Sequence, residues 1–152
     1  EHADLRVQVD VKSVSHNLRG GGWAGGSEYP VCVEIAYLDQ RGTAHRWRQG
    51  FYAIGDDTHG TSTKLPQGVW HTYTSPTLAE LAPLCADDAV RAGLGGWFRN
   101  PMHAYDASSR PAVITRVALF GAGWDFNGRA DNLRFVEASR DASPGVMPIP
   151  VR

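Results

Sequence analysis

The segment Pro111–Glu137 reads PAVITRVALFGAGWDFNGRADNLRFVE and contains two strand patterns separated by turn residues. In an extended chain alternate side chains point to opposite faces, so every second side chain of Val113–Leu119 shares one mostly apolar face. Asn127-Gly128 is the strongest short signal for a tight turn, and apolar and polar residues alternate again over Leu133–Phe135. We therefore predict that these two strands pair as a long antiparallel return, that is, a hairpin closed by Asn127-Gly128. The first strand should have one face fully in a core.

The strand pattern recurs along the rest of the chain. Leu5–Lys12 alternates apolar and polar residues, which is typical of a half-buried strand. Val31–Leu38 is apolar on both faces except at Glu34, which predicts a central strand covered on both sides, and Asp39–Gly42 predicts a turn. Strands at intervals of roughly ten to fifteen residues, with turn chemistry between them, predict an all-β fold, a two-sheet antiparallel β-sandwich.

Two segments depart from this pattern. Ser75 and Pro76 predict a short helix, with Ser75 as its N-cap, that ends near Pro83. Residues 85–110 have no period and predict a long irregular excursion that covers a core edge or forms a binding rim. We expect residues 1–138 to form one domain and residues 139–152 to form an extended, proline-containing tail that is a linker or an arm lying on a neighbour.

Composition excludes several classes of protein. The 152 residues carry a formal net charge of −1, whereas a nucleic-acid-binding domain needs a clustered basic face. No apolar run approaches the length of a transmembrane helix. The sequence begins with Glu1 rather than Met, which we interpret as a segment of a longer or processed precursor. Cys32 and Cys85 are either one disulfide or two buried thiols, and their spacing does not distinguish the two.

A set of glycine-rich and aromatic motifs carries a resemblance to a known family. The motifs are Gly20-Gly21-Gly22-Trp23, Ser27-Glu28-Tyr29-Pro30, Tyr37-Leu38-Asp39, Trp47 to Tyr52, Trp70, Arg116-Val117, Gly123-Trp124-Asp125-Phe126 and Asp131-Asn132. Together they resemble the galactose-binding-like jelly-roll modules of bacterial surface and envelope proteins. The resemblance implies a jelly-roll sandwich outside the cytoplasm, in the cell envelope or secreted. Many members bind carbohydrate, often with a structural calcium, and others act as spacers or assembly contacts.

Carbohydrate recognition needs aromatic rings that stack on pyranose faces and planar polar groups that bind hydroxyls. Trp23 and Trp97 lie beside glycines and are the better surface candidates, although Trp23 equally fits a plug on the core. Trp47 is the opposite case, because a strand tryptophan is more often a core residue of the sandwich. The candidate ligand-binding residues are Trp23, Trp47, Tyr52, Trp97, Arg48 and Asn100.

Acidic residues are the candidate metal ligands and catalytic groups of this sequence. If the resemblance extends to calcium, Glu28, Asp125 and Asp131 supply its oxygen ligands; alternatively, Asp131 accepts backbone hydrogen bonds at the start of the last strand. Most acidic residues fall in turns, where carboxylates cap backbone amides. The sequence has no Gly-x-Ser-x-Gly elbow and no histidine spacing typical of a catalytic site. We therefore do not expect an enzyme, and we expect no cofactor other than a structural calcium.

Two functions fit these observations. The first is a non-catalytic binding module that recognises carbohydrate or a protein neighbour through its loop end. The alternative is a structural or accessory subunit of a larger envelope or membrane-associated assembly, held by its loops and C-terminal tail. A carbohydrate site should expose two or more rings in one concave patch, whereas an assembly subunit should expose a broader apolar area.

Overall fold

The computed structural model describes residues 4–19, 28–55, 62–81, 110–138 and 144–149. Within these ranges almost every residue belongs to a strand or to the turn beside it, and the only helical element is a short 3₁₀ turn. The elements in chain order are β1 (Leu5–His16), β2 (Tyr29–Asp39), β3 (Ala44–Tyr52), β4 (Ser62–Lys64), β5 (His71–Thr77), η2 (Leu78–Glu80), β6 (Pro111–Ala122), β7 (Phe126–Glu137) and β8 (Gly145–Pro148).

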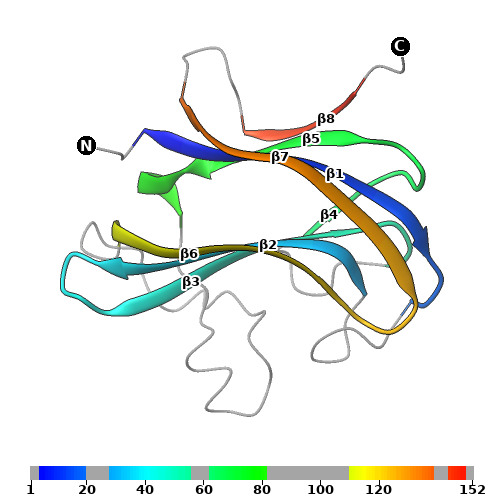
Figure 1. Ribbon diagram of the computed structural model, residues 1–152, viewed down its shortest axis with the longest axis horizontal. Helices are drawn as coiled ribbons and strands as arrows, with labels where there is room; N and C mark the ends of the chain where they lie inside the picture. The colour runs from blue at the N-terminus through cyan, green and yellow to red at the C-terminus, as the bar shows by residue number, and fades with distance from the viewer. Residues whose placement is uncertain (1–3, 20–27, 56–61, 82–109, 139–143, 150–152) are drawn as a thin grey trace.

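The strands form two layers that pack face to face (Figure 1). The first layer, sheet A, has the strand order β7-β1-β5-β8, and all its neighbouring strands are antiparallel. The second layer, sheet B, has the order β4-β3-β2-β6, and only its β3–β4 pair is parallel. The predicted two-sheet β-sandwich is therefore confirmed.

The core lies between the two sheets and follows the period-two pattern of the sequence. On β1, Val7, Val9 and Val11 are buried and the intervening residues are mostly only half-buried. The central position predicted for β2 is confirmed, because β2 pairs with β3 on one side and β6 on the other and is buried on both faces. The buried core residues are Val7, Val9, Val11, Val31, Val33, Ile35, Tyr37, Trp47, Phe51, Leu65, Tyr73, Leu78 and Leu81.

Aromatic contacts join the two sheets at the centre of this core. The ring of Trp47 on β3 stacks on Tyr73 of β5, with 6.5 Å between the centroids. Phe51 meets the same tyrosine edge to face at 5.0 Å. Rings in these arrangements gain about 0.5–1.5 kcal/mol beyond the effect of burial alone, so this cluster is a main source of inter-sheet stability.

The predicted antiparallel return over Pro111–Glu137 is wrong in its pairing. β6 pairs with β2 in sheet B and β7 pairs with β1 in sheet A, so the two strands belong to opposite layers. Figure 1 shows the chain crossing from the lower layer to the upper layer between them. The bend that connects them is Gly123–Asp125, and Asn127-Gly128 lies inside β7. The segment is thus a corner between sheets rather than a hairpin.

Gly128 is explained by close packing instead of turn geometry. A Cβ atom at this position would lie 2.0 Å from the carbonyl oxygen of Pro30, which is a backbone atom that cannot rotate away. Only glycine therefore lets β7 pass this close to the start of β2. Asn127-Gly128, which the sequence pattern assigns to a tight turn, therefore lies inside a strand. Its glycine is required because β7 passes close to Pro30.

The helical turn begins later than predicted, and part of the predicted tail is a strand. Ser75 and Pro76 belong to β5, and Thr77 is the residue that precedes η2, with its backbone N–H and its hydroxyl both donating to Glu80. The segment Gly145–Pro148, placed in the tail, pairs with β5 as an edge strand of sheet A. The excursion predicted at 85–110 lies outside the described residues except for Arg110.

The predicted turn at Asp39–Gly42 is confirmed, with Gly42 at φ 79°. The Asp39 carboxylate accepts hydrogen bonds from the backbone N–H groups of Arg41 and Thr43, and its second oxygen lies 2.9 Å from His45 Nε2. Burial alone would raise the pKa of Asp39, but these hydrogen bonds outweigh it and lower the pKa to about 2.

This turn gives a pH-dependent prediction for Asp39→Asn. The stability that comes from a lowered carboxyl pKa is fully present above the ordinary value of 3.8 and is lost as the pH falls through about 2. We expect the variant to melt below the wild type at pH 7 and the difference to shrink between about pH 4 and pH 2. Thermal melts across this range test it, with the exposed acid variant Asp4→Asn as control. A difference that does not change with pH would contradict the prediction.

Candidate functional site

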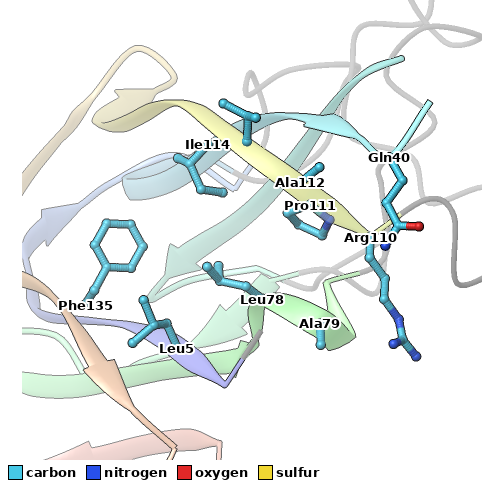
Figure 2. Close-up of a pocket in the computed structure, with 10 residues that line it drawn as sticks. Leu5, Gln40, Leu78, Ala79, Arg110, Pro111, Ala112, Ile114 and Phe135 are labelled. Carbon is cyan, nitrogen blue, oxygen red and sulfur yellow. The ribbon is translucent and has the colours of Figure 1, made fainter. Parts of the chain in front are cut away.

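An apolar cleft lies where the two sheets separate. The cleft has a volume of about 740 Å³ and lies between the start of β6 and the end of β7. In Figure 2, Ile114 from β6 and Phe135 from β7 approach the cleft from opposite layers, and Leu5 and Leu78 lie beneath them. The lining residues are Leu5, Gln40, Leu78, Ala79, Arg110, Pro111, Ala112, Val113, Ile114 and Phe135.

Strand register explains why the apolar side chains of β6 and β7 point toward the interior of the sandwich. Residues paired across antiparallel strands share a face of the sheet. Leu119 pairs with the core residue Val33, and Phe135 pairs with the core residue Val7. Even so, Leu119 is 36% exposed and Phe135 is 45% exposed. Both sit on outermost strands of their sheets among the described strands, so nothing in these sheets covers one side of them.

Leu133 extends this apolar edge along β7. It lies two residues before Phe135 on the same face of the strand and is 41% exposed. We use the name edge cleft for the cavity together with the half-exposed inward residues Leu119, Leu133 and Phe135. The edge cleft therefore presents core-type side chains to the outside along one open side of the sandwich.

A charged triad lies on the outer face of sheet B beside the edge cleft. Glu34 on β2 accepts hydrogen bonds from the guanidinium groups of Arg48 on β3 and Arg116 on β6. Burial alone would raise the pKa of Glu34, but the two arginines outweigh it and lower the pKa. Glu34 is therefore ionised at neutral pH, and one carboxylate faces two cations. The Arg116 side chain is 58% exposed, so this member of the triad is accessible at β6.

A second feature is the braced corner between β6 and β7. The fully buried carboxylate of Glu28 accepts hydrogen bonds from the backbone N–H groups of Trp124 and Asp125. Gly123 has φ 140°, and a Cβ atom there would lie 2.7 Å from the Glu28 side chain. The corner thus depends on a buried acid and a glycine, and it presents the Trp124 ring with 82% exposure.

His16 supports the same corner from β1. Its Nδ1 accepts hydrogen bonds from the backbone N–H groups of Ala53 and Ile54, so the ring proton sits on Nε2, which lies 3.9 Å from Glu28. Burial lowers the pKa of His16, against the raising effects of the Leu18 backbone and the Glu28 carboxylate. The histidine is therefore neutral at pH 7 and serves as a structural acceptor.

The structure buries three of the six predicted ligand-binding residues. Trp47 is 1% exposed in the inter-sheet core, and Tyr52 is also buried. Arg48 is buried against Glu34. Burial of the two rings and the guanidinium speaks against a direct contact of these three side chains with a ligand at the surface. The other three, Trp23, Trp97 and Asn100, lie outside the described residues and stay predictions.

The predicted calcium ligands are not brought together. Glu28 and Asp125 meet at the braced corner, where Glu28 binds backbone amides and Asp125 accepts from the Asn17 side chain. Asp131 lies farther along β7, opposite Asp10, and accepts from the Asn132 backbone N–H. The described part of the chain has no group of three or more His, Cys, Asp or Glu side chains arranged to hold a metal ion. Asp131 accepts a backbone hydrogen bond, as its alternative role predicts, but it lies inside β7 rather than at the start of the last strand.

The two exposed rings of the described residues do not share a patch. Trp124 precedes β7 and Phe135 is near its far end. About ten residues of extended chain separate them, which is roughly 30 Å. Within the described ranges, the surface therefore offers an aliphatic cleft and a single tryptophan rather than the paired aromatic platform expected for a sugar site.

Cys32 is a free, buried thiol, and Cys85 lies outside the described residues. Burial raises the pKa of Cys32 far above its ordinary range. The thiolate that would act as a nucleophile or ligand is therefore not formed at neutral pH. Cys32 is therefore chemically inert in this environment.

Sequence reasoning missed the edge cleft and the charged triad. The apolar residues of β6 and β7 were correctly assigned to strands, but their exposure depends on strand order, which the pattern does not contain. The triad had one available signal, since Glu34 was the single charged residue in an otherwise apolar strand and therefore needed buried partners.

Comparison with protein-family models, curated proteins and solved structures finds no match for this chain. The class that the fold and its surface define is a two-sheet β-sandwich with one open apolar edge. Among the described residues, no helix is both long and apolar enough to span a membrane. The galactose-binding-like resemblance and the location it implies stay predictions.

Proposed function

We propose that this chain is a non-catalytic β-sandwich module that binds a protein neighbour through the edge cleft. The observation that supports this best is the partial exposure of core-type side chains on two strands at once, Leu119 on β6 and Leu133 and Phe135 on β7. Apolar groups exposed together on one edge mark an interaction surface more often than isolated exposed residues do. An aliphatic lining also suits protein side chains better than sugar hydroxyls.

The chemistry of the cleft supports binding rather than catalysis. Among the described residues, its lining contains a single ionisable side chain, Arg110, and no carboxylate or histidine that could transfer a proton. The buried acids of sheet B are both occupied, Glu34 by two guanidinium groups and Asp39 by backbone N–H groups of its turn. The cleft therefore combines an apolar lining with one charged side chain, Arg110, which is typical of a recognition site.

Selection from a random peptide library and a glycan array on the intact chain tests the proposal. We expect enrichment of peptides and no glycan signal, with Phe135→Glu weakening the selected peptides by about tenfold or more because it places a charge at the centre of the apolar surface. Asn127→Glu, an exposed position on the same strand, is the matched control and should bind as the wild type does. Melting curves establish that both variants are folded.

Two outcomes would refute the proposal. One is glycan binding without peptide enrichment, and the other is peptide binding that Phe135→Glu leaves unchanged. The first outcome would favour a second candidate, carbohydrate recognition at the braced corner. That candidate rests on the 82% exposure of Trp124, and it predicts that Trp124→Ala abolishes the glycan signal.

A further inference from the structure

We infer that the edge cleft binds the free C-terminus of a partner protein, with the terminal carboxylate at Arg110 and the last apolar side chains inside the cleft. This inference rests on the proposed function and specifies which part of the partner is bound. Capture of a C-terminal carboxylate is a recurring mode of peptide recognition, because it combines one charge with a few anchoring side chains.

The described lining of the cleft is polar at one end only. In Figure 2, Arg110 and Gln40 lie at one end of the lining, whereas Ile114 and Phe135 lie toward the other end. The remaining lining residues of the described chain are all apolar. A ligand that matches this distribution has one polar end and an otherwise apolar surface.

Arg110 determines the charge of the group that suits the polar end. It lies directly before β6, is exposed, and forms no salt bridge with another described residue. A guanidinium stays positively charged in a protein, and its planar N–H groups donate two parallel hydrogen bonds to a carboxylate. Charge complementarity therefore favours an anionic end, which in an unmodified protein partner is a carboxylate.

The apolar lining favours a chain end over an internal segment. An internal segment would bring peptide N–H and C=O groups on both sides of each inserted side chain, and buried amides without hydrogen-bond partners are costly. Gln40 and Arg110 are the only polar side chains that the described lining offers to them. A C-terminal residue instead leaves its carboxylate at the polar end and inserts only its side chain among residues such as Leu78 and Ile114.

The course of β6 and β7 gives the direction of the bound chain. Arg110 lies at the start of β6, and Phe135 lines the same cleft near the end of β7, whereas Leu119 and Leu133 lie farther along the two strands. The partner residues that precede the carboxylate therefore run from Leu119 and Leu133 toward Arg110. The volume of about 740 Å³ lies within the roughly 300–1,000 Å³ typical of ligand pockets, which suits about two or three apolar residues.

Acetylated peptides of the form Gly-Ser-Gly-Ser-X-X, in which each X is Val, Leu, Ile or Phe, test the inference as free acids and as C-terminal amides. Isothermal titration with the intact chain gives the affinities. The tightest free acid should bind at least about fivefold more tightly than its own amide, because the amide lacks the charge that pairs with Arg110. Adding Gly-Ser-Gly after the last apolar residue should weaken binding by a similar factor, because it moves the carboxylate away from the cleft. Equal affinities of the acid and the amide would overturn the inference.

Variants of Arg110 show whether this residue causes the preference for the acid. Arg110→Gln should reduce the preference to less than about twofold, and Arg110→Glu should reverse it. The matched control is Arg129→Gln, which removes the same charge at an exposed position of β7 roughly 20 Å along the strand from Phe135 and should keep the preference.

The dependence on salt gives a second readout of the same contact. Because Arg110 is exposed, the preference of the wild type for the acid should shrink as the salt concentration rises. Circular dichroism melts show that the variants fold. A preference that Arg110→Gln leaves unchanged would contradict the assignment of the carboxylate to this residue and overturn the inference.

The remaining outcomes separate this inference from the proposed function. If peptides bind in a manner that depends on Phe135 but acids and amides bind equally well, recognition of a C-terminus is refuted and the binding function stands. If neither the library peptides nor the free acids depend on Phe135, both are refuted.

Two other occupants of the edge cleft are distinguished in the same way. Sodium decanoate has an apolar chain and one carboxylate but no peptide group, so Arg110-dependent binding of decanoate that is tighter than that of every peptide acid would overturn both proposals. A dimer of the isolated chain that Phe135→Glu dissociates and the peptide acids do not would identify a second copy as the occupant and would overturn the inference.

Discussion

Trp47→Ala is expected to lower the free energy of unfolding by about 3–5 kcal/mol, the range typical of a tryptophan deleted from a core. The indole is 1% exposed and stacks on Tyr73 across the two sheets, so its removal leaves a cavity at the centre of the inter-sheet contact. The surrounding residues belong to strands with fixed register and collapse only partly. Urea unfolding followed by circular dichroism measures the effect.

The matched control is Trp124→Ala. Trp124 is 82% exposed at the braced corner, and surface substitutions usually change stability by less than about 0.5 kcal/mol. The two tryptophans differ mainly in burial, so the comparison isolates packing from residue type. A loss below about 1 kcal/mol for Trp47→Ala would contradict the placement of Trp47 in the core and reopen its role as a ligand platform.

Glu34→Ala is expected to lower the free energy of unfolding by a similar amount, about 3–5 kcal/mol, for a different reason. The substitution removes the carboxylate that neutralises Arg48, whose side chain is only 4% exposed. The guanidinium then stays buried without this counter-charge, and such a state costs more than the ion pair itself contributes. Chemical denaturation at neutral pH gives the loss.

Two further variants show whether the effect comes from the loss of the Glu34 carboxylate as a counter-charge. Arg116→Ala removes the exposed partner of Glu34 and is expected to cost about 1 kcal/mol or less, because exposed ion pairs are weak. The double variant Glu34→Leu/Arg48→Met replaces both buried charges by apolar groups and should recover most of the stability lost in Glu34→Ala. A double variant as unstable as Glu34→Ala would show that the cost comes from packing instead.

The sequence predicted the fold because burial on a pleated strand has a period of two. Leu5–Lys12 and Val31–Leu38 were correctly assigned, one as half-buried and the other as central, since apolar residues on one face or on both faces report directly on coverage. The turn at Asp39–Gly42 was also predictable, because the glycine and the capping aspartate act locally. Local chemistry and periodicity were sufficient for these elements.

Strand order was not predictable, because it depends on contacts between distant residues. Pro111–Glu137 contains two strands and a turn dipeptide, and proximity in the chain favours pairing them. The actual bend lies earlier, at Gly123–Asp125, where buried Glu28 binds the backbone amides. Gly128 serves the close approach to Pro30 instead. Neither Glu28 nor Pro30 is near these residues in the sequence, so no local signal identified the crossing.

The site was predicted less well than the fold for the same reason. Aromatic and planar polar residues were taken as ligand candidates by type, but Trp47, Tyr52 and Arg48 are buried. Conversely, Phe135 has the pattern of a core residue and is 45% exposed because β7 is an outermost strand of sheet A. Residue type indicates what a side chain can bind, whereas strand order determines whether it is accessible.

The central claim is that the open edge between β6 and β7 is the recognition surface of this module. The most direct test is backbone amide protection of the intact chain, measured residue by residue by NMR, with and without the tightest peptide from the library selection. The account predicts new protection at Arg116–Phe120 on β6 and shifted signals at Leu133 and Phe135 on β7. Changes confined to the braced corner at Trp124 and Asp125, with β6 unaltered, would contradict it.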